Sequence, residues 1–365
     1  MNKDDKIVNK NKNSWGFFPQ ADLEFCESEG LFFGRIIREN RGQYLIASGD
    51  SIYDGEVSGA FRYKAICPAD YPGVGDWVAF REITNPIIIE KVLTRKSSFS
   101  RKTAGIKTEE QIIAANVDYI FLVFAINGGR NFTASGLERY LIMAWDSGAL
   151  PVVVLNKSDL CNEEERESAL LTAEASTPGV DIKLVSAETG EGLDDLLVNI
   201  PPESTLALVG PSGVGKSSLI NALSGKTLQK THAQRETDLR GRHTTTHREL
   251  FRLETGHLLI DTPGMRELQL WGDSDSANNT FSDIAEIANN CKFSDCRHEG
   301  EPGCAVQKAL AEGFLEYRRF ENYLDLRREL DYLQRKKDEK STGKDQKKWK
   351  DISKEIRRYY KEKNQ

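Results

Sequence analysis

GPSGVGKSS, residues Gly210 to Ser218, is the stretch of this chain that decides the fold. An apolar run over residues 206–209 precedes it, and an amphipathic run over residues 219–223 follows it. This order predicts a strand, a tight glycine loop and the start of a helix. Backbone N–H groups in such a loop cradle phosphate, and the helix N-terminus adds a partial positive charge there. The pattern indicates a nucleoside triphosphate site in an α/β domain, without identifying the base.

The loop supplies side chains as well as backbone N–H groups. Lys216 is expected to reach the β- and γ-phosphates, and the Ser217 hydroxyl is expected to bind Mg2+. Contacts to the nucleotide are expected from Gly210, Pro211, Ser212, Gly213, Val214, Gly215, Lys216, Ser217 and Ser218.

A second motif lies upstream of the phosphate loop. Residues 151–155 (PVVVL) predict a buried strand, and the next four residues read NKSD. The Asp159 carboxylate can accept hydrogen bonds from N1–H and N2–H of guanine, which adenine does not offer in that form. A later strand over residues 181–185 precedes Ala187, whose backbone N–H is expected to face guanine O6. Ligands of parallel sheets bind at the carboxyl ends of strands, so the two motifs predict one guanine site. Its residues are Asn156, Lys157, Ser158, Asp159, Ser186 and Ala187.

The residues after the phosphate loop predict a sensor of the γ-phosphate and Mg2+. Residues 241–246 (GRHTTT) lie in a stretch without apolar periodicity, as expected of a flexible loop. A predicted hairpin follows and ends in DTPG, residues 261–264. Asp261 is expected to hold the hydration shell of Mg2+, and the Gly264 N–H is expected to meet the γ-phosphate.

The group that orients the attacking water is also expected here. Ras-like GTPases place a glutamine directly after the DTPG motif, where this chain has Met265. Methionine cannot orient water, so His243 is the candidate, and an ordinary loop histidine is the alternative. Thr245 is chosen as the Mg2+ ligand, with Thr244 and Thr246 as alternatives. The catalytic set is His243, Lys216 and Thr245, and the Mg2+ set is Ser217, Thr245 and Asp261.

Bulk composition describes a globular chain. The chain has 365 residues, which is long enough for two or three domains with their own cores. Of these residues 39% are hydrophobic and 29% are charged. No apolar run approaches the ~20 residues of a membrane span. The polar start, residues 1–13, lacks a signal core, so we expect a cytoplasmic protein with no membrane partner.

The charge is uneven along the chain. The net charge is −6, but residues 327–365 carry 15 Lys or Arg against 8 Asp or Glu. A basic tail on an acidic body predicts a polyanionic partner that is reached by one end. A solvated charged helix would explain the same charge.

Short β-rich runs over residues 31–95 predict a small barrel of the OB-fold class. The runs are residues 32–37, 43–46, 60–63, 76–80 and 87–89. Such barrels bind RNA through aromatic and basic side chains, although most aromatic side chains here are expected in the core. The positive charge is expected from Arg35, Arg38, Arg41, Arg62 and Lys64.

Three further segments complete the N-terminal part of the domain plan. Residues 1–30 are expected to be an extension whose aromatic cluster, at residues 15–18, packs on the next domain. Residues 96–115 are basic and rich in Ser, Thr and Gly, which predicts a linker, either in contact with phosphate or solvated. Residues 116–272 alternate strands and helices, as expected of an α/β domain with a phosphate loop.

Three cysteines and one histidine lie close together near the C-terminus. The spacing is Cys291-x4-Cys296-x-His298-x5-Cys304. Such a closed tetrahedral set binds a structural Zn2+ and leaves no open position for chemistry; reduced cysteines in a helical region are the alternative. Residues 273–334 are therefore expected to form a helical zinc-binding domain, followed by a basic tail over residues 335–365.

Taken together, these motifs make the sequence similar to the RsgA (YjeQ) family of circularly permuted GTPases. The resemblance spans residues 31–330 and includes YPGVGDWV (71–78) and AANVD (114–118). It also includes NKSD, the phosphate loop, GRHTTT, DTPGMRE and the Cys/His cluster. In this family the base-recognition motifs precede the phosphate loop, as they do here.

The resemblance implies a GTPase that binds the small ribosomal subunit and its rRNA. Such an enzyme hydrolyses GTP to GDP and phosphate, is stimulated by the subunit, and acts late in subunit maturation. The resemblance supports the role of His243, one structural Zn2+ and Mg2+ bound with GTP; a monomer is expected. An rRNA-binding assembly scaffold with a mainly structural nucleotide is the alternative. The intact Lys216, Ser217, Thr245 and Asp261 favour the GTPase.

Overall fold

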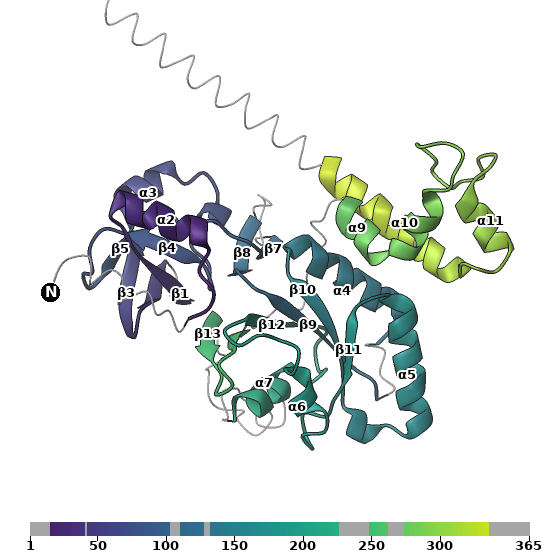
Figure 1. Ribbon diagram of the computed structural model, residues 1–365, viewed down its shortest axis with the longest axis horizontal. Coiled ribbons are helices and arrows are strands. Elements are labelled where there is room, and N and C mark those ends of the chain that lie inside the picture. Colours follow the sequence, from purple (N-terminus) through teal and green to yellow (C-terminus); the bar gives the residue numbers. More distant parts are fainter. Residues whose placement is uncertain are drawn as a thin grey trace, which may run out of the picture. The chain divides into compact units, whose positions relative to one another are not determined.

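The structure is a computed structural model that describes most of the chain (Figure 1). The described residues are 15–40, 42–102, 110–127, 132–225, 248–261 and 274–335. The chain divides into two compact units, residues 1–269 and residues 270–365, and each is described by itself.

A parallel sheet forms the centre of the first unit. Its order is β11-β10-β9-β12-β14, and neighbouring strands are parallel. The strands are β9 (Tyr119–Ala125), β10 (Leu150–Asn156), β11 (Asp181–Leu184), β12 (Thr205–Val209) and β14 (Leu258–Asp261). The middle strands are continuous apolar runs because helices cover both faces of such a sheet. The predicted α/β region is therefore confirmed as a parallel sheet.

Four helices accompany this sheet. They are α4 (Ala134–Ser147), α5 (Glu163–Ser176), α6 (Leu193–Leu196) and α7 (Lys216–Ser224). Leu137 and Leu141 of α4 belong to one buried cluster, whereas Leu219 and Ile220 of α7 belong to another. Two apolar layers thus hold the sheet, and the loops at its strand ends remain available for a ligand.

The predicted hairpin before the DTPG motif is confirmed. Strand β13 (Arg248–Arg252) pairs antiparallel with β14 and also with β1 (Phe32–Asn40). Through β13 the parallel sheet continues into the N-terminal strands, so the strands of the described residues form one twelve-stranded sheet and one separate hairpin.

The N-terminal strands curl around a core of their own. They are β1, β2 (Gln43–Ser48), β3 (Ser51–Val57), β4 (Trp77–Phe80), β5 (Ile87–Ile89) and β6 (Lys91–Val92). We call this region, residues 31–95, the barrel part. Its core includes Ile36, Ile46, Phe80 and Ile87. β1 pairs with both β2 and β4, and β3 pairs with β5, so the strands share one apolar interior.

The sequence interpretation of the barrel part was wrong at one element. Residues 60–63 were expected as a strand, but they belong to helix α3 (Gly59–Lys64). The Ser58 hydroxyl accepts a hydrogen bond from the Phe61 N–H, which fixes the helix start. The third strand is β3 instead, at residues where no strand was predicted.

The predicted linker over residues 96–115 is also wrong, because most of it is a β-hairpin. Strands β7 (Ser98–Lys102) and β8 (Glu110–Ala115) pair antiparallel. Phe99 and Ile113 are buried in the large core cluster, and Ala114 forms a bridge with Val74 of the barrel part. The segment therefore packs between the barrel part and the parallel sheet.

The described part of the N-terminal extension packs as expected, with one exception. Phe18 stacks on Phe33 with ring centroids 4.0 Å apart, whereas Phe17 remains 65% exposed. Helix α2 (Gln20–Glu29) follows and buries Cys26 against the barrel part. Aromatic packing thus anchors this segment.

The second unit is helical in its described residues. It contains α9 (Ser274–Thr280), α10 (Ser282–Ala288), α11 (Ala305–Ala311) and a helix over residues 317–335. Arg319 forms a bidentate ion pair with Asp283, which joins the last helix to α10. Among the described helices of both units, none has the length and apolar character needed to cross a membrane.

Candidate functional site

The phosphate loop follows β12 and packs closely against β9. A Cβ atom on Gly210 would lie 2.1 Å from the carbonyl oxygen of Val123, so only glycine fits against β9 at this point. Gly215, with φ 95°, caps the N-terminus of α7. The loop is therefore held between a strand and a helix start, which is the arrangement that binds phosphate.

Lys216 folds back on the loop that carries it. Its Nζ donates to the carbonyl oxygens of Gly210 and Pro211, both at 2.6 Å. Ser217 is the second residue of α7 and is partly buried. The ammonium group thus lies beside the first two residues of the loop, where it could pair with a bound anion.

Asn156 joins the base-recognition loop to the phosphate loop. Its Nδ2 donates to the Val214 carbonyl at 2.8 Å, and its Oδ1 accepts from the Ala187 N–H at 3.0 Å. The Ala187 N–H, which was expected to face guanine O6, therefore has an acceptor within the protein. Lys157 has φ 67°, a left-handed conformation that is uncommon outside glycine, and this strain marks the loop as a constrained site.

Asp159 is held by the second half of the base motif. Its Oδ1 accepts from the Ser186 hydroxyl at 2.6 Å. Ser158 is fully buried, and its hydroxyl donates to Glu191 at 3.1 Å. Arg166 donates to the Ser158 carbonyl and to Glu191, so this turn has support on two sides. The structure brings together the residues that the sequence assigned to the guanine site.

Asp261 ends strand β14, and in the register of the hairpin its Cα partner is Glu249 of β13. It therefore lies at the carboxyl end of the strand next to β12, as the Mg2+ assignment requires. His243, Thr245 and Gly264 lie outside the described residues, so their predicted roles remain predictions.

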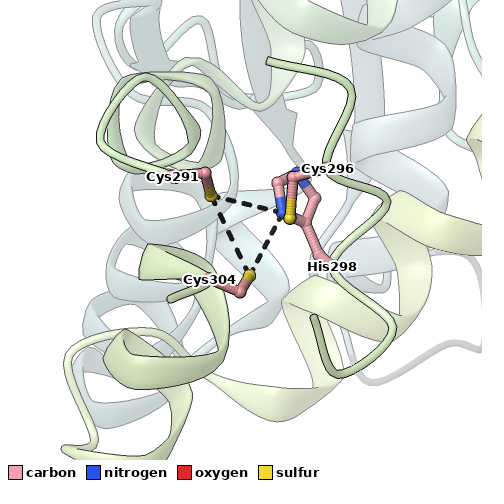
Figure 2. A group of neighbouring side chains, drawn as sticks. All are labelled: Cys291, Cys296, His298 and Cys304. Atoms are coloured by element: carbon pink, nitrogen blue, oxygen red, sulfur yellow. Dashed lines mark hydrogen bonds between the residues drawn. The ribbon is translucent and has the colours of Figure 1, made fainter. Parts of the chain in front are cut away.

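The Cys/His cluster of the second unit forms a compact group (Figure 2). Its ligand atoms, from Cys291, Cys296, His298 and Cys304, all lie within 4.8 Å of one another. Cys291 Sγ lies 3.9 Å from Cys304 Sγ and 3.7 Å from His298 Nδ1, and Cys304 Sγ lies 3.4 Å from His298 Nδ1. Around a tetrahedral Zn2+, with bonds of about 2.3 Å to sulfur and 2.0 Å to nitrogen, such separations are roughly 3.5–3.8 Å. The four side chains therefore fit a zinc ion.

The surroundings favour the metal-binding forms of His298 and Cys291, whereas desolvation raises the pKa of the Cys296 thiol to about 11. Burial lowers the pKa of His298, and the charge of Arg327 lowers it further, which keeps the imidazole neutral. Burial opposes ionisation of Cys291, but hydrogen bonds from the backbone N–H groups of Ala305 and Val306 lower the pKa of this thiol. His298 has φ 64°, so backbone strain coincides with a candidate ligand.

Three residues that support the nucleotide site were not predicted from the sequence. Glu191 and Arg166 buttress the base loop, and Arg35 reaches the strand that leads to the phosphate loop. Arg35 was expected to supply charge for RNA, but it is 1% exposed and cannot do so. A basic residue inside a β-rich apolar run, as in FFGRII, was the one available signal.

Comparisons with known proteins agree with this geometry. The RsgA GTPase family model matches residues 92–271. The chain is 45% identical to small ribosomal subunit biogenesis GTPase RsgA 1 of Oceanobacillus iheyensis, over 87% of this chain and 91% of that protein. It is 39% identical to the RsgA protein of Streptomyces avermitilis, over 92% of this chain and 90% of that protein.

Solved structures show the same arrangement of the fold. YjeQ from Thermotoga maritima matches with a TM-score of 0.63 and 26% identity, over 82% of this chain and 98% of that one. YloQ, described as a circularly permuted GTPase, matches with a TM-score of 0.60 and 27% identity, over 82% of this chain and 95% of that one. Here too β10 and its base motif precede β12 and the phosphate loop in the chain. Because these relatives are GTPases, the chain is a GTP hydrolase, which argues against an assembly scaffold with a mainly structural nucleotide. The chain belongs to the RsgA GTPase family.

Proposed function

We propose that this GTPase binds the small ribosomal subunit, hydrolyses GTP there in a subunit-stimulated manner, and acts late in the maturation of that subunit. The relatives carry the name small ribosomal subunit biogenesis GTPase and match most of this chain. The observation that carries the proposal is the bridge made by Asn156, which joins a guanine motif to a phosphate loop in permuted order.

In this proposal Asp159 reads guanine by accepting from N1–H and N2–H, with Lys157 along the base. Lys216 exchanges its two carbonyl acceptors for the β- and γ-phosphates. Ser217 and Asp261 would hold Mg2+, which would neutralise developing charge on the phosphate oxygens when bound with GTP. The remaining residues of the phosphate loop bind phosphate through their backbone N–H groups.

His243 and Thr245 complete the proposed machinery. His243 orients the attacking water in place of the glutamine of Ras-like enzymes, because Met265 has no group that can do so. Thr245 would contribute to holding Mg2+ and the γ-phosphate, and the Gly264 N–H would donate to the γ-phosphate. Slow turnover without a partner is expected of such a site.

The cysteine cluster is proposed to hold one structural Zn2+. Cys291, Cys296, His298 and Cys304 would fill all four positions, so the ion contributes to folding rather than to hydrolysis.

Two regions are proposed to meet rRNA. The barrel part is proposed to be an OB-fold, with Arg38, Arg62 and Lys64 as basic groups; Arg41 lies outside the described residues. The basic tail, residues 335–365, lies outside them except for its first residue, and its charge suits a polyanion. We further propose a cytoplasmic monomer, with a GTPase domain over residues 116–272 and a zinc-binding domain over residues 273–334.

The deciding experiment is GTP turnover measured with and without purified small ribosomal subunits. The expected result is turnover that rises with subunit concentration and saturates. Binding without any rise in turnover would contradict the proposal. Removing residues 335–365 is expected to reduce the slope of subunit affinity against salt concentration. An unchanged slope would show that the tail stays solvated and makes no phosphate contacts.

A further inference from the structure

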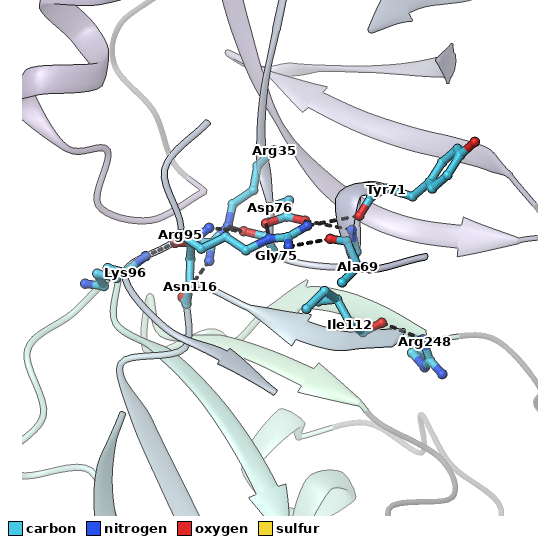
Figure 3. A network of polar contacts seen from close by, with 11 residues as sticks. Arg35, Ala69, Tyr71, Gly75, Asp76, Arg95, Lys96, Ile112, Asn116 and Arg248 are labelled. Carbon is cyan, nitrogen blue, oxygen red and sulfur yellow. Dashed lines mark hydrogen bonds and ion pairs between the residues drawn. The ribbon is translucent and has the colours of Figure 1, made fainter. Parts of the chain in front are cut away.

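Arg35 lies on β1, and its guanidinium is buried between the barrel part and the parallel sheet (Figure 3). It donates to three carbonyl oxygens, those of Trp15 at 2.5 Å, Gly75 at 3.1 Å and Asn116 at 3.0 Å. It also donates to the Thr205 hydroxyl at 2.9 Å. One side chain thus joins the N-terminal arm, the barrel part, the segment before β9 and the first residue of β12.

The charge of Arg35 is compensated inside the protein. Burial lowers the pKa of Arg35 to about 10, while the carboxylates of Asp118 and Asp76 raise it, so the side chain is charged at neutral pH. The guanidinium also lies over the Trp77 ring, 5.2 Å from its centroid. A buried charge is stable only where its partners are fixed, so the segments around Arg35 must move together or break several hydrogen bonds.

The backbone segments around Arg35 are packed too closely to slide past one another. Gly75 has φ +91°, and a Cβ on it would lie 2.1 Å from the Ala115 carbonyl oxygen. The Asn116 side chain donates to the Gly75 carbonyl at 3.1 Å and accepts from the Lys96 N–H at 3.0 Å. The barrel part therefore meets the end of β8 and Asn116, the segment that leads into β9, at close range (Figure 3).

Strand β1 belongs to both parts of the first unit. Ile36 lies in the core of the barrel part, whereas Ile37 lies in the large cluster of the parallel sheet. Arg38 forms an ion pair with Glu249 of β13, whose partner across the hairpin is Asp261. No hinge separates the barrel part from the sheet along this strand.

The contacts of Arg35 lead toward the nucleotide site along two strands. Thr205 begins β12, which runs into the phosphate loop at Gly210, and its N–H donates to Asp118 at 2.8 Å. Asp118 directly precedes β9, whose Val123 carbonyl lies against Gly210. A shift of Arg35 would therefore act on both strands that position the loop.

We propose that Arg35 is a positioning residue that couples the barrel part to the phosphate loop, so that binding of the small ribosomal subunit by the barrel part raises GTP turnover through the Arg35–Thr205 contact. The inference rests on the proposed function, because it assigns the route of the subunit stimulation proposed above. It predicts that variants of the Arg35–Thr205 contact lose stimulation of GTP turnover by the subunit but keep basal nucleotide binding.

The test compares Thr205→Val, which keeps the β-branched shape but loses the acceptor, with Thr205→Ser, which keeps the hydroxyl. For each full-length variant we would measure basal turnover, GDP affinity, subunit affinity, and kcat and KM in the presence of subunits. Residues that carry coupling change it by about 0.5–2 kcal/mol, so Thr205→Val is expected to reduce the stimulation ratio by about 2- to 30-fold. Basal turnover and both affinities are expected to stay within about twofold of wild type, and Thr205→Ser is expected to restore the ratio.

Arg35→Met is the stronger variant, and Arg81→Met is its surface control, because Arg81 is exposed and pairs with Glu90 in the barrel part. If Arg35→Met fails to fold, Thr205→Val still decides. An unchanged stimulation ratio in Thr205→Val, or equal losses in basal and stimulated turnover, would overturn the coupling. Wild-type turnover that subunits do not raise would instead overturn the proposed function, and the coupling with it.

Discussion

The side-chain amide of Asn156 lies 2.8 Å from the carbonyl oxygen of Val214, so one residue of the base loop holds the phosphate loop in place. Replacing it by alanine would leave that carbonyl and the Ala187 N–H without their partner. Each lost bond to a buried group costs about 1–3 kcal/mol, so Asn156→Ala is expected to weaken GDP binding roughly 10- to 100-fold. Fluorescent GDP titration measures this directly.

Asn162→Ala is the matched control for this prediction. Asn162 caps helix α5 through a bond from the Glu165 N–H, so the hydrogen bond that its side chain makes lies within that helix. Its loss is expected to lower the melting temperature by a few degrees, since a cap is worth about 1 kcal/mol, with GDP affinity unchanged. Equal GDP affinities in Asn156→Ala and wild type would contradict the bridging role.

Two glycines of the phosphate loop are expected to respond differently to alanine. A Cβ on Gly210 would lie 2.1 Å from the Val123 carbonyl oxygen, whereas a Cβ on Gly213 would have no atom within 4 Å. Both have positive φ, so Gly213→Ala carries only the backbone strain of about 1–2 kcal/mol. Gly210→Ala adds a clash with β9, and we expect the larger fall in both melting temperature and GDP affinity. Equal effects of the two substitutions would refute the close packing.

Asp159→Asn is expected to exchange one base preference for another. An asparagine keeps an oxygen that can accept from the Ser186 hydroxyl but replaces a carboxylate oxygen by an N–H donor. That donor faces the N2 amino group of guanine unfavourably and suits the carbonyl at the same place in xanthine. Because charge-assisted bonds are worth about 1.5–3 kcal/mol, GDP affinity is expected to fall by about tenfold or more. Competition between GDP and xanthosine diphosphate checks this, and an unchanged ratio would exclude Asp159 as the base reader.

The sequence predicted the GTPase part well because its signals are local. The apolar run PVVVL and the glycine spacing around Lys216 each fix a strand or loop without distant information. The Cys/His cluster was also recognised by its spacing alone, and the side chains at Cys291 and Cys304 do converge. Such motifs carry their structural context with them.

The errors fall where distant contacts decide the outcome. Residues 60–63 have strand-like residues, but the Ser58 cap and the packing of Phe61 in the barrel core favour helix α3. Residues 96–115 look like a linker by composition, yet the bridge between Val74 and Ala114 gives them a partner. Tertiary packing outweighs local propensity in both cases. Burial of Arg35 likewise depends on partners up to 170 residues away.

Loss of one zinc ligand is expected to affect only the second unit. A structural zinc is worth roughly 10–16 kcal/mol shared by four ligands, so Cys304→Ser is expected to weaken metal binding by about a hundredfold or more. Metal analysis would show less than one zinc per chain, and proteolysis would cleave residues 274–335 faster. GDP affinity is expected to stay unchanged because the nucleotide loops lie in the first unit. Cys161→Ser, outside the cluster, is the control, and a full zinc content in Cys304→Ser would contradict the assigned set.

Cys26 is expected to resist alkylation in the native protein even at high pH. Burial, together with the charge of Asp22, raises its pKa from 9.0 to about 11, against a smaller opposing effect of Lys91. At pH 9 the thiolate would be only about 1% of the side chain, whereas an unfolded chain would hold about half. The folded protein retains the proton, so this group's contribution to stability is complete below pH 9 and is lost as the pH rises toward 11. Peptide mass spectrometry after iodoacetamide treatment at pH 7, 8 and 9 measures the effect, with the half-buried Cys67 as the internal reference and a urea-unfolded sample as the upper limit. Modification of Cys26 at the rate of Cys67 at pH 9 would show that α2 does not bury this thiol against the barrel part.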